Sequence, residues 1–356
     1  GERGDRAPSA GRGAAQAGEP GTGRDRMRVA LIGAGTMGAL HARLLCATDG
    51  VDVVTIADAT PGRAAAVAAD VGAEPAASIG AALDGADAVV IAAATAAHAE
   101  LIREAIGRGL PTFCEKPLAS DLEDTIALTE AIERSGVPFQ MGFQRRFDPA
   151  YREARRLVES GELGTIYLVR LIAHDAEWPH AAYVPEVGGL FRDSSIHDFD
   201  AIRFMTGGEV STVYAVGANR IFPAFEPTGD IDTTGAILTM ADGTLGILSQ
   251  TRRNPRGYDV RMELVGSGDA VSMGVGPRMP SRSLEPDAPP PAPGWESFLT
   301  RFEAAYRAEL QAFIPVARRE APSLCTARDG LAAMRIAVAA TRSVAERRAV
   351  ELATID

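Results

Sequence analysis

One lysine stands in a chain whose other basic side chains are all arginine. Of the 36 Lys and Arg residues only Lys116 is lysine, within the run Phe113-Cys114-Glu115-Lys116-Pro117. An ammonium is a compact donor whose pKa shifts on burial, whereas a guanidinium stays protonated and presents a wide planar fork. Lys116 is therefore the first candidate for proton handling. The alternative is a surface cation that has survived in an arginine-rich chain.

An acid and a histidine form the second candidate pair. Asp193 and His197 are four positions apart in a segment predicted as a helix over 191–200, so they should be neighbours on one face. A carboxylate beside an imidazole can fix the ring tautomer and raise its basicity, which suits a general base. A structural Asp–His pair on a helix is the alternative.

A glycine-rich turn is the clearest motif of the first half. The run Gly33-Ala34-Gly35-Thr36-Met37-Gly38 follows an apolar segment predicted as a strand over 28–32 and precedes a helical stretch. A second predicted strand, 53–57, ends in Asp58, twenty positions after the third glycine. This order of strand, GxGxxG, helix, strand and acid is typical of a dinucleotide-binding domain.

Each glycine of the motif has its own expected role in holding the cofactor. Gly33 permits the tight turn, Gly35 lets the backbone approach the pyrophosphate, and Gly38 lets the helix pack on the sheet. The pyrophosphate would lie on the amides of the helix N-terminus, which begins near Thr36 and Met37.

The acid at the end of the second strand sets the expected cofactor preference. Asp58 should accept hydrogen bonds from the adenosine ribose, and its charge would repel a 2′-phosphate. NAD is therefore expected in preference to NADP. Arg63 is close enough in sequence to soften this preference, although it is expected on the outer face of the next helix. A solvated loop aspartate is the alternative for Asp58.

The alternation of strands and helices continues through the first half. Further strands are expected over 88–92, 111–114 and 137–143. Lys116 follows the second of these at its carboxyl end, where ligands bind in open parallel sheets. A helix is expected after the strand 88–92, and Thr95 and His98 lie at its start. They could contact the nicotinamide ribose, or they could only cap that helix.

The second half has a different pattern, with turn residues between short strands. Expected strands cover about 165–173, 210–217, 231–240, 244–251 and 258–265. Asp242-Gly243 joins two of them as a hairpin, which indicates antiparallel pairing. A proline-rich loop over 276–294 and helices near 296–318 and 327–346 follow. The expected fold class is α/β: a doubly wound parallel sheet of the Rossmann type, then an α+β domain with a mostly antiparallel, open-faced sheet.

Composition narrows the class of protein further. The 356 residues suggest two domains, 27–146 and 147–356, after a leader over 1–26 that has too few large apolar side chains to fold. The net charge of −11 argues against nucleic acid or an anionic membrane as partner, and no apolar run has membrane-spanning length. The three cysteines lie far apart, so no disulfide and no metal site are expected, in a reducing, cytoplasmic location.

Three motifs together resemble those of the Gfo/Idh/MocA family of NAD(P)-dependent sugar and polyol dehydrogenases. They are the glycine-rich run 33–38, Glu115-Lys116-Pro117, and the Asp-x-x-x-His spacing of Asp193 and His197. The similarity extends from Met27 almost to the C-terminus. Two longer segments resemble the inositol 2-dehydrogenase branch in particular, namely 141–148 and 189–200.

The resemblance implies a catalytic set of Lys116, Asp193 and His197. In that scheme His197 takes the hydroxyl proton, Asp193 orients and stabilises the imidazolium, and Lys116 stabilises the developing alkoxide. Lys116 would also adjoin the cofactor, together with Glu115. Further residues are expected to bind substrate hydroxyls: Arg145, His174 and Tyr258. Arg145 could instead be a structural pairing residue.

The expected function is NAD-dependent oxidation of a secondary hydroxyl of a cyclic, inositol-like polyol or sugar to a ketone. The resemblance also implies an oligomer interface on the C-terminal domain, usually that of a homodimer or homotetramer. Two alternatives stay open: a dehydrogenase or reductase of an amino- or nucleotide-linked sugar or glycoside, and a non-catalytic NAD(H)-sensing regulator. The segment 175–187 lies where substrate selectivity is expected.

Overall fold

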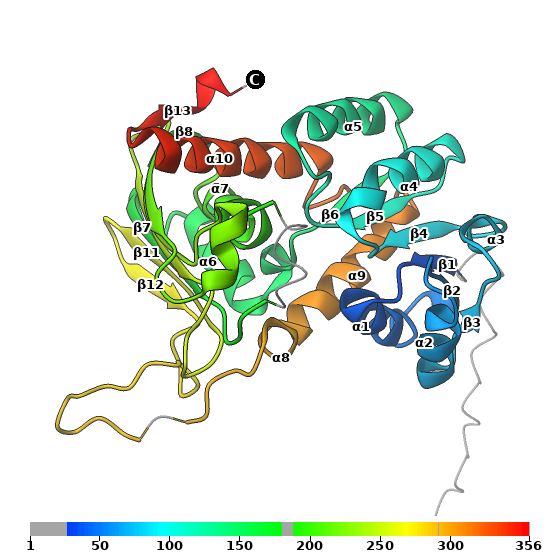
Figure 1. The fold of residues 1–356 in the computed structure, drawn as a ribbon, viewed down its shortest axis with the longest axis horizontal. Coiled ribbons are helices and arrows are strands. Elements are labelled where there is room, and N and C mark those ends of the chain that lie inside the picture. Colours follow the sequence, from blue (N-terminus) through cyan, green and yellow to red (C-terminus); the bar gives the residue numbers. More distant parts are fainter. Residues whose placement is uncertain (1–26, 180–187, 291, 356) are drawn as a thin grey trace, which may run out of the picture.

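Two sheets, each with its own helices, make up the chain in the computed structural model (Figure 1). The structure describes residues 27–179, 188–290 and 292–355. The predicted leader over 1–26 and most of the segment 175–187 therefore lie outside the described residues. The fold class predicted from the sequence is confirmed.

The first sheet has six strands in the order β3-β2-β1-β4-β5-β6, and every neighbouring pair is parallel. Its strands are β1 (Met27–Ile32), β2 (Val51–Ala57), β3 (Glu74–Pro75), β4 (Ala88–Ile91), β5 (Thr112–Glu115) and β6 (Phe139–Gly142). The strands β4, β5 and β6 are buried along their whole length. The uninterrupted apolar run of β4 therefore forms a central strand, because helices cover both faces of the sheet.

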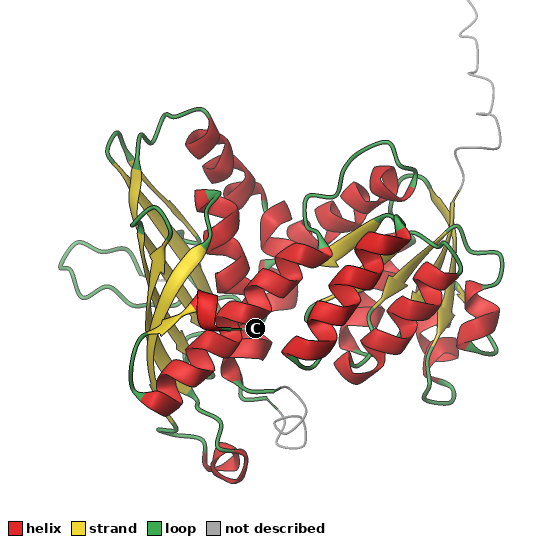
Figure 2. Cartoon of the chain, turned by 90° about the horizontal axis from the view of Figure 1, so that it is seen from above, coloured by secondary structure: helices red, strands yellow, loops and turns green. Residues whose placement is uncertain are grey.

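Five helices connect these strands and lie on the two faces of the sheet (Figure 2). They are α1 (Thr36–Leu45), α2 (Arg63–Val71), α3 (Ile79–Leu83), α4 (Thr95–Gly107) and α5 (Leu122–Ser135). The strand order places the carboxyl ends of β1, β4 and β5 side by side, with the glycine-rich turn after β1. This edge is the expected ligand side of a doubly wound sheet.

The second sheet has seven strands in the order β12-β11-β7-β10-β9-β8-β13. They are β7 (Ile166–His174), β8 (Val210–Ala218), β9 (Thr233–Met240), β10 (Leu245–Thr251), β11 (Asp259–Gly266), β12 (Ala270–Met273) and β13 (Val350–Glu351). Only the β7–β10 pair is parallel. The predicted hairpin joins β9 to β10, with Gly243 at a φ of 90°, a conformation that glycine adopts at little cost.

Helices gather on one face of this second sheet (Figure 2). The helices of this half are α6 (Pro149–Glu159), α7 (Ile196–Thr206), α8 (Phe298–Arg301), α9 (Glu303–Ala317) and α10 (Ala327–Glu346). Short turns accompany them: η1 (Gln144–Phe147), the π-helical η3 (Phe191–Ser195), η4 (Pro223–Thr228) and η5 (Leu352–Thr354). The single helix predicted over 296–318 is divided at the buried Phe302, which ends α8.

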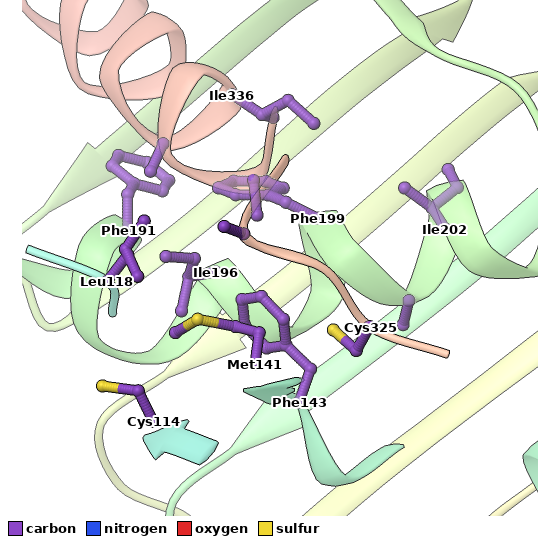
Figure 3. Packing of buried hydrophobic residues seen from close by; sticks show 14 of the residues in the cluster. Cys114, Leu118, Met141, Phe143, Phe191, Ile196, Phe199, Ile202, Cys325 and Ile336 are labelled. Carbon is purple, nitrogen blue, oxygen red and sulfur yellow. The ribbon is translucent and has the colours of Figure 1, made fainter. Parts of the chain in front are cut away.

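Packing between the halves holds the site together. Phe191 and Phe199, from η3 and α7, belong to one buried cluster with Leu118, Met141 and Phe143 of the first half (Figure 3). In the other direction, α9 returns to the first sheet, and Phe313 on it packs edge-on against Phe113 of β5 at 5.9 Å. The segment that carries Asp193 and His197 is therefore fixed against the end of the parallel sheet.

Candidate active site

Lys116 lies directly after β5, at the carboxyl edge of the parallel sheet, and reaches toward the second half of the chain. Its Nζ donates to the backbone carbonyl of Asp193 at 2.6 Å and lies 3.3 Å from Asp193 Oδ1. One fifth of the lysine side chain is exposed. Lys116 is thus a partly buried ammonium held at one known position, in contrast to a surface cation that water surrounds.

The second partner of Asp193 is an arginine that sequence reasoning missed. Arg252, just after β10, donates through Nη1 to Asp193 Oδ2 at 2.5 Å, and its side chain is almost fully buried. Burial alone would raise the pKa of Asp193, but the charges of Lys116 and Arg252 hold it below its ordinary value. Asp193 is therefore an anion between two cations. Sequence spacing gives no signal for this pair, because 59 residues separate Asp193 from Arg252.

The predicted contact between Asp193 and His197 is not formed in the structure. Nδ1 of His197 is buried and has no hydrogen-bond partner among the residues that the structure describes, and Asp193 turns to Lys116 and Arg252 instead. The reason is local: Asp193 belongs to a π-helical turn, and the wider winding of such a turn removes the four-residue alignment of an α-helix. The prediction that Asp193 fixes the tautomer of His197 is wrong for this geometry.

His197 still lies close to Lys116, with its ring packed edge-on against Phe143 at 5.7 Å. Burial, and then the positive charges of Lys116 and Arg145, lower the pKa of His197 well below its ordinary value. The imidazole is therefore neutral near pH 7, so it is ready to accept a proton. The predicted rise in its basicity is contradicted, since the neighbouring charges are cations.

Arg145 has a structural partner. It lies in η1, is 3% exposed, and pairs with the fully buried Asp198 on α7. Next to it, Arg146 forms a forked pair with Asp200. Of the two roles that the sequence left open for Arg145, the observed contact is the structural one: it ties η1 to α7, the helix that begins one residue before His197.

The other predicted substrate ligands lie where β7 and β11 meet. His174 ends β7, with Nε2 at 3.2 Å from Ser249 Oγ and Nδ1 at 3.9 Å from Asp259. Tyr258 is buried, and its ring packs edge-on against Phe302 at 6.3 Å.

One more acid of this region was missed. Asp175 follows β7, and burial raises its pKa to about 6, partly opposed by Arg252. Its charge also interacts with Asp193 and Lys116, so it belongs to the same electrostatic site. The sequence offered a weak signal for Asp175, since it begins the segment expected to govern selectivity.

The glycine-rich turn is built for close backbone approach, as the motif predicts. Gly33 has a φ of 101°, and a Cβ there would lie 2.5 Å from the carbonyl oxygen of Ala92. A Cβ on Gly38 would lie 1.9 Å from the carbonyl oxygen of Gly33, whereas one on Gly35 would meet nothing within 4 Å. Gly35 therefore faces open space at the N-cap of α1, where a pyrophosphate fits.

The first turn of α1 and the end of β2 complete the dinucleotide cradle. Thr36 begins α1, and the partly buried Met37 packs against the apolar cluster beneath it. Asp58 Oδ2 accepts from the amide of Ala34 at 2.7 Å, and Asp58 Oδ1 accepts from that of Thr60 at the same distance. These bonds and Arg63, 3.5 Å away, hold the pKa of Asp58 below its ordinary value against the effect of burial.

His98 and Thr95, the two residues predicted to contact the nicotinamide ribose, differ in their surroundings. His98 is 1% exposed, with Nδ1 at 2.8 Å from the carbonyl oxygen of Pro117 and Nε2 at 3.1 Å from that of Ala93. It therefore links the loops after β4 and β5 from within. Thr95 begins α4 but makes no side-chain cap. Glu115 is buried, and its Oε2 accepts from the backbone amide of Lys116 at 3.2 Å. Glu115 therefore holds the backbone of Lys116.

A parallel Rossmann sheet with a glycine-rich cradle, joined to a second half in which η3 and α7 carry Asp193 and the neutral His197, defines a two-part dinucleotide-dependent oxidoreductase. The chain belongs to the Gfo/Idh/MocA oxidoreductase family. The family's NAD-binding Rossmann model matches residues 27–143, and the model of its C-terminal domain matches residues 151–272. The predictions of family, of an NAD-dependent oxidoreductase and of NAD as cofactor are confirmed.

Several of the proteins that this chain resembles are named as inositol dehydrogenases. The chain is 40% identical over 321 residues to a myo-inositol dehydrogenase of Streptomyces leeuwenhoekii, covering 89% of this chain and 97% of that protein. It is 36% identical over 335 residues to an inositol 2-dehydrogenase of Rhizobium meliloti, covering 92% and 99%. A solved scyllo-inositol dehydrogenase of Lactobacillus casei, with bound NAD(H) and scyllo-inositol, has a TM-score of 0.83 at 28% identity, covering 92% and 100%.

Among the described residues, no helix combines the length and the apolar character needed to cross a membrane.

Proposed function

We propose that this protein is an NAD-dependent dehydrogenase that oxidises one secondary hydroxyl of a cyclic, inositol-like polyol to a ketone. The observation that carries the proposal is the placement of Lys116 against Asp193, at the carboxyl edge of the sheet that holds the dinucleotide cradle. The names of relatives that match nearly the whole chain support the substrate class.

The proposed chemistry divides the reaction between the cofactor and the protein. When bound, the nicotinamide ring supplies the hydride acceptor. His197, neutral because of burial and nearby cations, takes the hydroxyl proton; since Nδ1 is enclosed, Nε2 is the nitrogen that can face the substrate. Lys116 donates a hydrogen bond to the developing alkoxide and stabilises its charge.

Asp193 has a different role in this mechanism from the one predicted by spacing. It anchors Lys116 through both its backbone carbonyl and its carboxylate, while Arg252 holds the other carboxylate oxygen. The ammonium is therefore preorganised before substrate arrives. His174, Tyr258 and Asp175 are the proposed contacts for the remaining hydroxyls. Asp175 interacts electrostatically with Lys116 and Asp193, and Tyr258 interacts with Asp175. His174 ends β7 and directly precedes Asp175.

The open face of the second sheet is proposed to hold a second copy of the chain. Tyr214, Ile237 and Ile247 are exposed and lie in one row across β8, β9 and β10. Large apolar side chains in such a row mark interaction surfaces. A homodimer or homotetramer would bury them. The cytoplasmic location stays a proposal too, supported by the three free cysteines.

A substrate panel tests the proposed function. NAD reduction by the purified protein is measured with myo-, scyllo- and chiro-inositol, monosaccharides, and amino- or nucleotide-linked sugars, and each active substrate is repeated with NADP. We expect turnover with at least one inositol and a higher kcat/KM for NAD. Turnover restricted to a linked sugar would assign the chain to that alternative. Tight NADH binding without turnover of any substrate would favour a sensor.

A further inference from the structure

A buried cluster of three titratable side chains lies beneath Lys116, outside the proposed mechanism. His41 of α1, Glu115 of β5 and Glu309 of α9 each offer an atom, and these atoms lie within 4.8 Å of one another. His41 and Glu309 are fully buried, and Glu115 is 7% exposed. Three elements that are distant in sequence thus bring two carboxyl groups together in the interior.

One contact in the cluster is a strong hydrogen bond, whereas Glu309 makes none with its carboxyl group. His41 Nε2 lies 2.7 Å from Glu115 Oε1. Both carboxyl oxygens of Glu309 are buried, and neither has a hydrogen-bond partner in the described part of the chain. The backbone carbonyl of Glu309 accepts from Gln140 Nε2 at 2.8 Å, so the helix itself is tied to β6 at this point.

The charge state of the cluster follows from its surroundings. Two ionised carboxylates this close, with water removed, would repel each other strongly. The groups that face Glu309 are Glu115 from β5, His41 from α1, Tyr306 from its own helix and the Cys325 thiol. Burial, and then the charge of Glu115, raise the pKa of Glu309 well above its ordinary value. The raised pKa favours the protonated, uncharged form of Glu309 beside the Glu115 carboxyl group.

Glu115 connects this cluster to the reacting lysine. Its Oε1 is held by His41 and its Oε2 accepts from the Lys116 amide. A polar, uncharged neighbour leaves the carboxyl group of Glu115 turned toward that amide. An ionised neighbour would displace Glu115 by repulsion. An apolar one would leave the carboxyl group of Glu115 beside a side chain with no polar group and loosen its hold on the amide.

We propose that Glu309 is a positioning residue for the dehydrogenation: packed under the His41–Glu115 pair, it keeps Glu115 in place and, through Glu115, the backbone of Lys116. The inference rests on the role proposed above for Lys116. The proposal gives a function to α9, the helix of the second half that packs against the cofactor-binding sheet.

Two substitutions of Glu309 separate this role from its alternatives. Glu309→Gln keeps the size and the uncharged polar character, so kcat and the pH profile should stay within about twofold of wild type. Glu309→Leu removes the polar neighbour. Since a misplacement of about 1 Å at a reacting group can cost up to ~100-fold in rate, kcat should fall roughly tenfold or more, with an altered pH profile and an unchanged KM for NAD. Glu303→Gln, an exposed position on the same helix, is the matched control.

A spectroscopic arm needs no activity. The infrared difference spectrum between wild type and Glu309→Gln at pH 7 should show the C=O stretch of a protonated carboxyl group, and metal analysis of the purified wild type should find no stoichiometric ion. A carboxylate band instead, or a bound ion lost in Glu309→Gln, would overturn the proposal. These results are independent of whether Lys116 or the polyol assignment fails.

The kinetic arm has its own contrary outcomes. Glu309→Gln as inactive as Glu309→Leu would show that the ionised form is needed. Glu309→Leu with normal kcat and pH profile, and only a lower Tm, would reduce Glu309 to a packing residue. Should Glu309→Leu not fold, Glu115→Ala removes the carboxyl oxygen that accepts from the Lys116 amide, so kcat should fall with the KM for NAD retained; a normal kcat there would contradict the proposal.

Discussion

At the scale of single residues, the site depends on how each charge is held. Asp193 is an anion between Lys116 and Arg252, and His197 is a neutral base whose neighbours are cations. The site therefore differs from one in which a carboxylate accepts a hydrogen bond from the histidine. In the proposed mechanism, the imidazolium of His197 would have no ion pair at Nδ1 with any described acid, so its release of the proton would be favoured.

The pH dependence of turnover should report the lowered pKa of His197. Because the His197 pKa is depressed, the neutral base persists below the ordinary imidazole pKa of about 6.5. The acid limb of kcat/KM should therefore lie below that value, with activity flat from there to neutrality. His197→Ala should lower kcat by roughly 10²-fold or more and abolish this limb. An acid limb above about 7 would show that His197 is paired with an acid during turnover.

At the scale of elements, the π-helical turn before α7 and the end of β10 together set the geometry. The π-helical turn directs the side chain of Asp193 away from the helix face that carries His197. Arg252 is the first residue after β10. Arg252 also lies over the ring of Phe225 in η4, 5.6 Å from its centroid. A loop of the second sheet thereby fixes the carboxylate that anchors the lysine of the first.

Removal of Arg252 should therefore cost both stability and rate. Arg252→Ala leaves Asp193 without its second cation in a largely buried site, and breaking a buried ion pair costs about 3–5 kcal/mol. Urea denaturation measures this loss. The control is Arg170→Ala, whose exposed pair with Glu263 should contribute less than ~1 kcal/mol. Equal losses in the two variants would mean that the Arg252 pair is no more than a surface contact.

Sequence patterns predicted those elements whose signals are local. The buried apolar runs and the glycine-rich turn gave the parallel sheet, and Asp242-Gly243 gave the hairpin. The π-helical turn carries no such signal, because Phe191–Ser195 has the composition of an ordinary helix start. The two-residue strand β13, at Val350–Glu351, pairs with β8 only because α10 delivers it there.

At the scale of the whole molecule, the candidate site belongs to neither half alone. Lys116 comes from the parallel sheet, while Asp193, His197 and Arg252 come from the second half. The motifs shared with the family were enough to predict that Lys116, Asp193 and His197 belong to one site. Arg252 and Glu309 are seen only in three dimensions, since the residues that they face, Asp193 and the His41–Glu115 pair, lie 59 or more positions away.

The open face of the second sheet makes a prediction about assembly. Ile237 lies in the centre of the exposed row, between Tyr214 and Ile247. Ile237→Glu would place a charge in the proposed interface, so light scattering should show a smaller species than the wild-type oligomer. Leu284→Glu, at an exposed loop position, is the control and should not change the mass. A monomeric wild type would contradict the proposed assembly.

The central claim is that Lys116, held by Asp193 where the two halves meet, stabilises the reacting oxygen. Its most direct test is kcat of Lys116→Arg with the best inositol of the panel, alongside the Kd for NAD. The substitution keeps the charge but replaces a compact donor with a wide fork. We predict that kcat falls by roughly 10²-fold, the scale for loss of one preorganised transition-state donor, while NAD binding persists. A near-normal kcat in Lys116→Arg would contradict the mechanism.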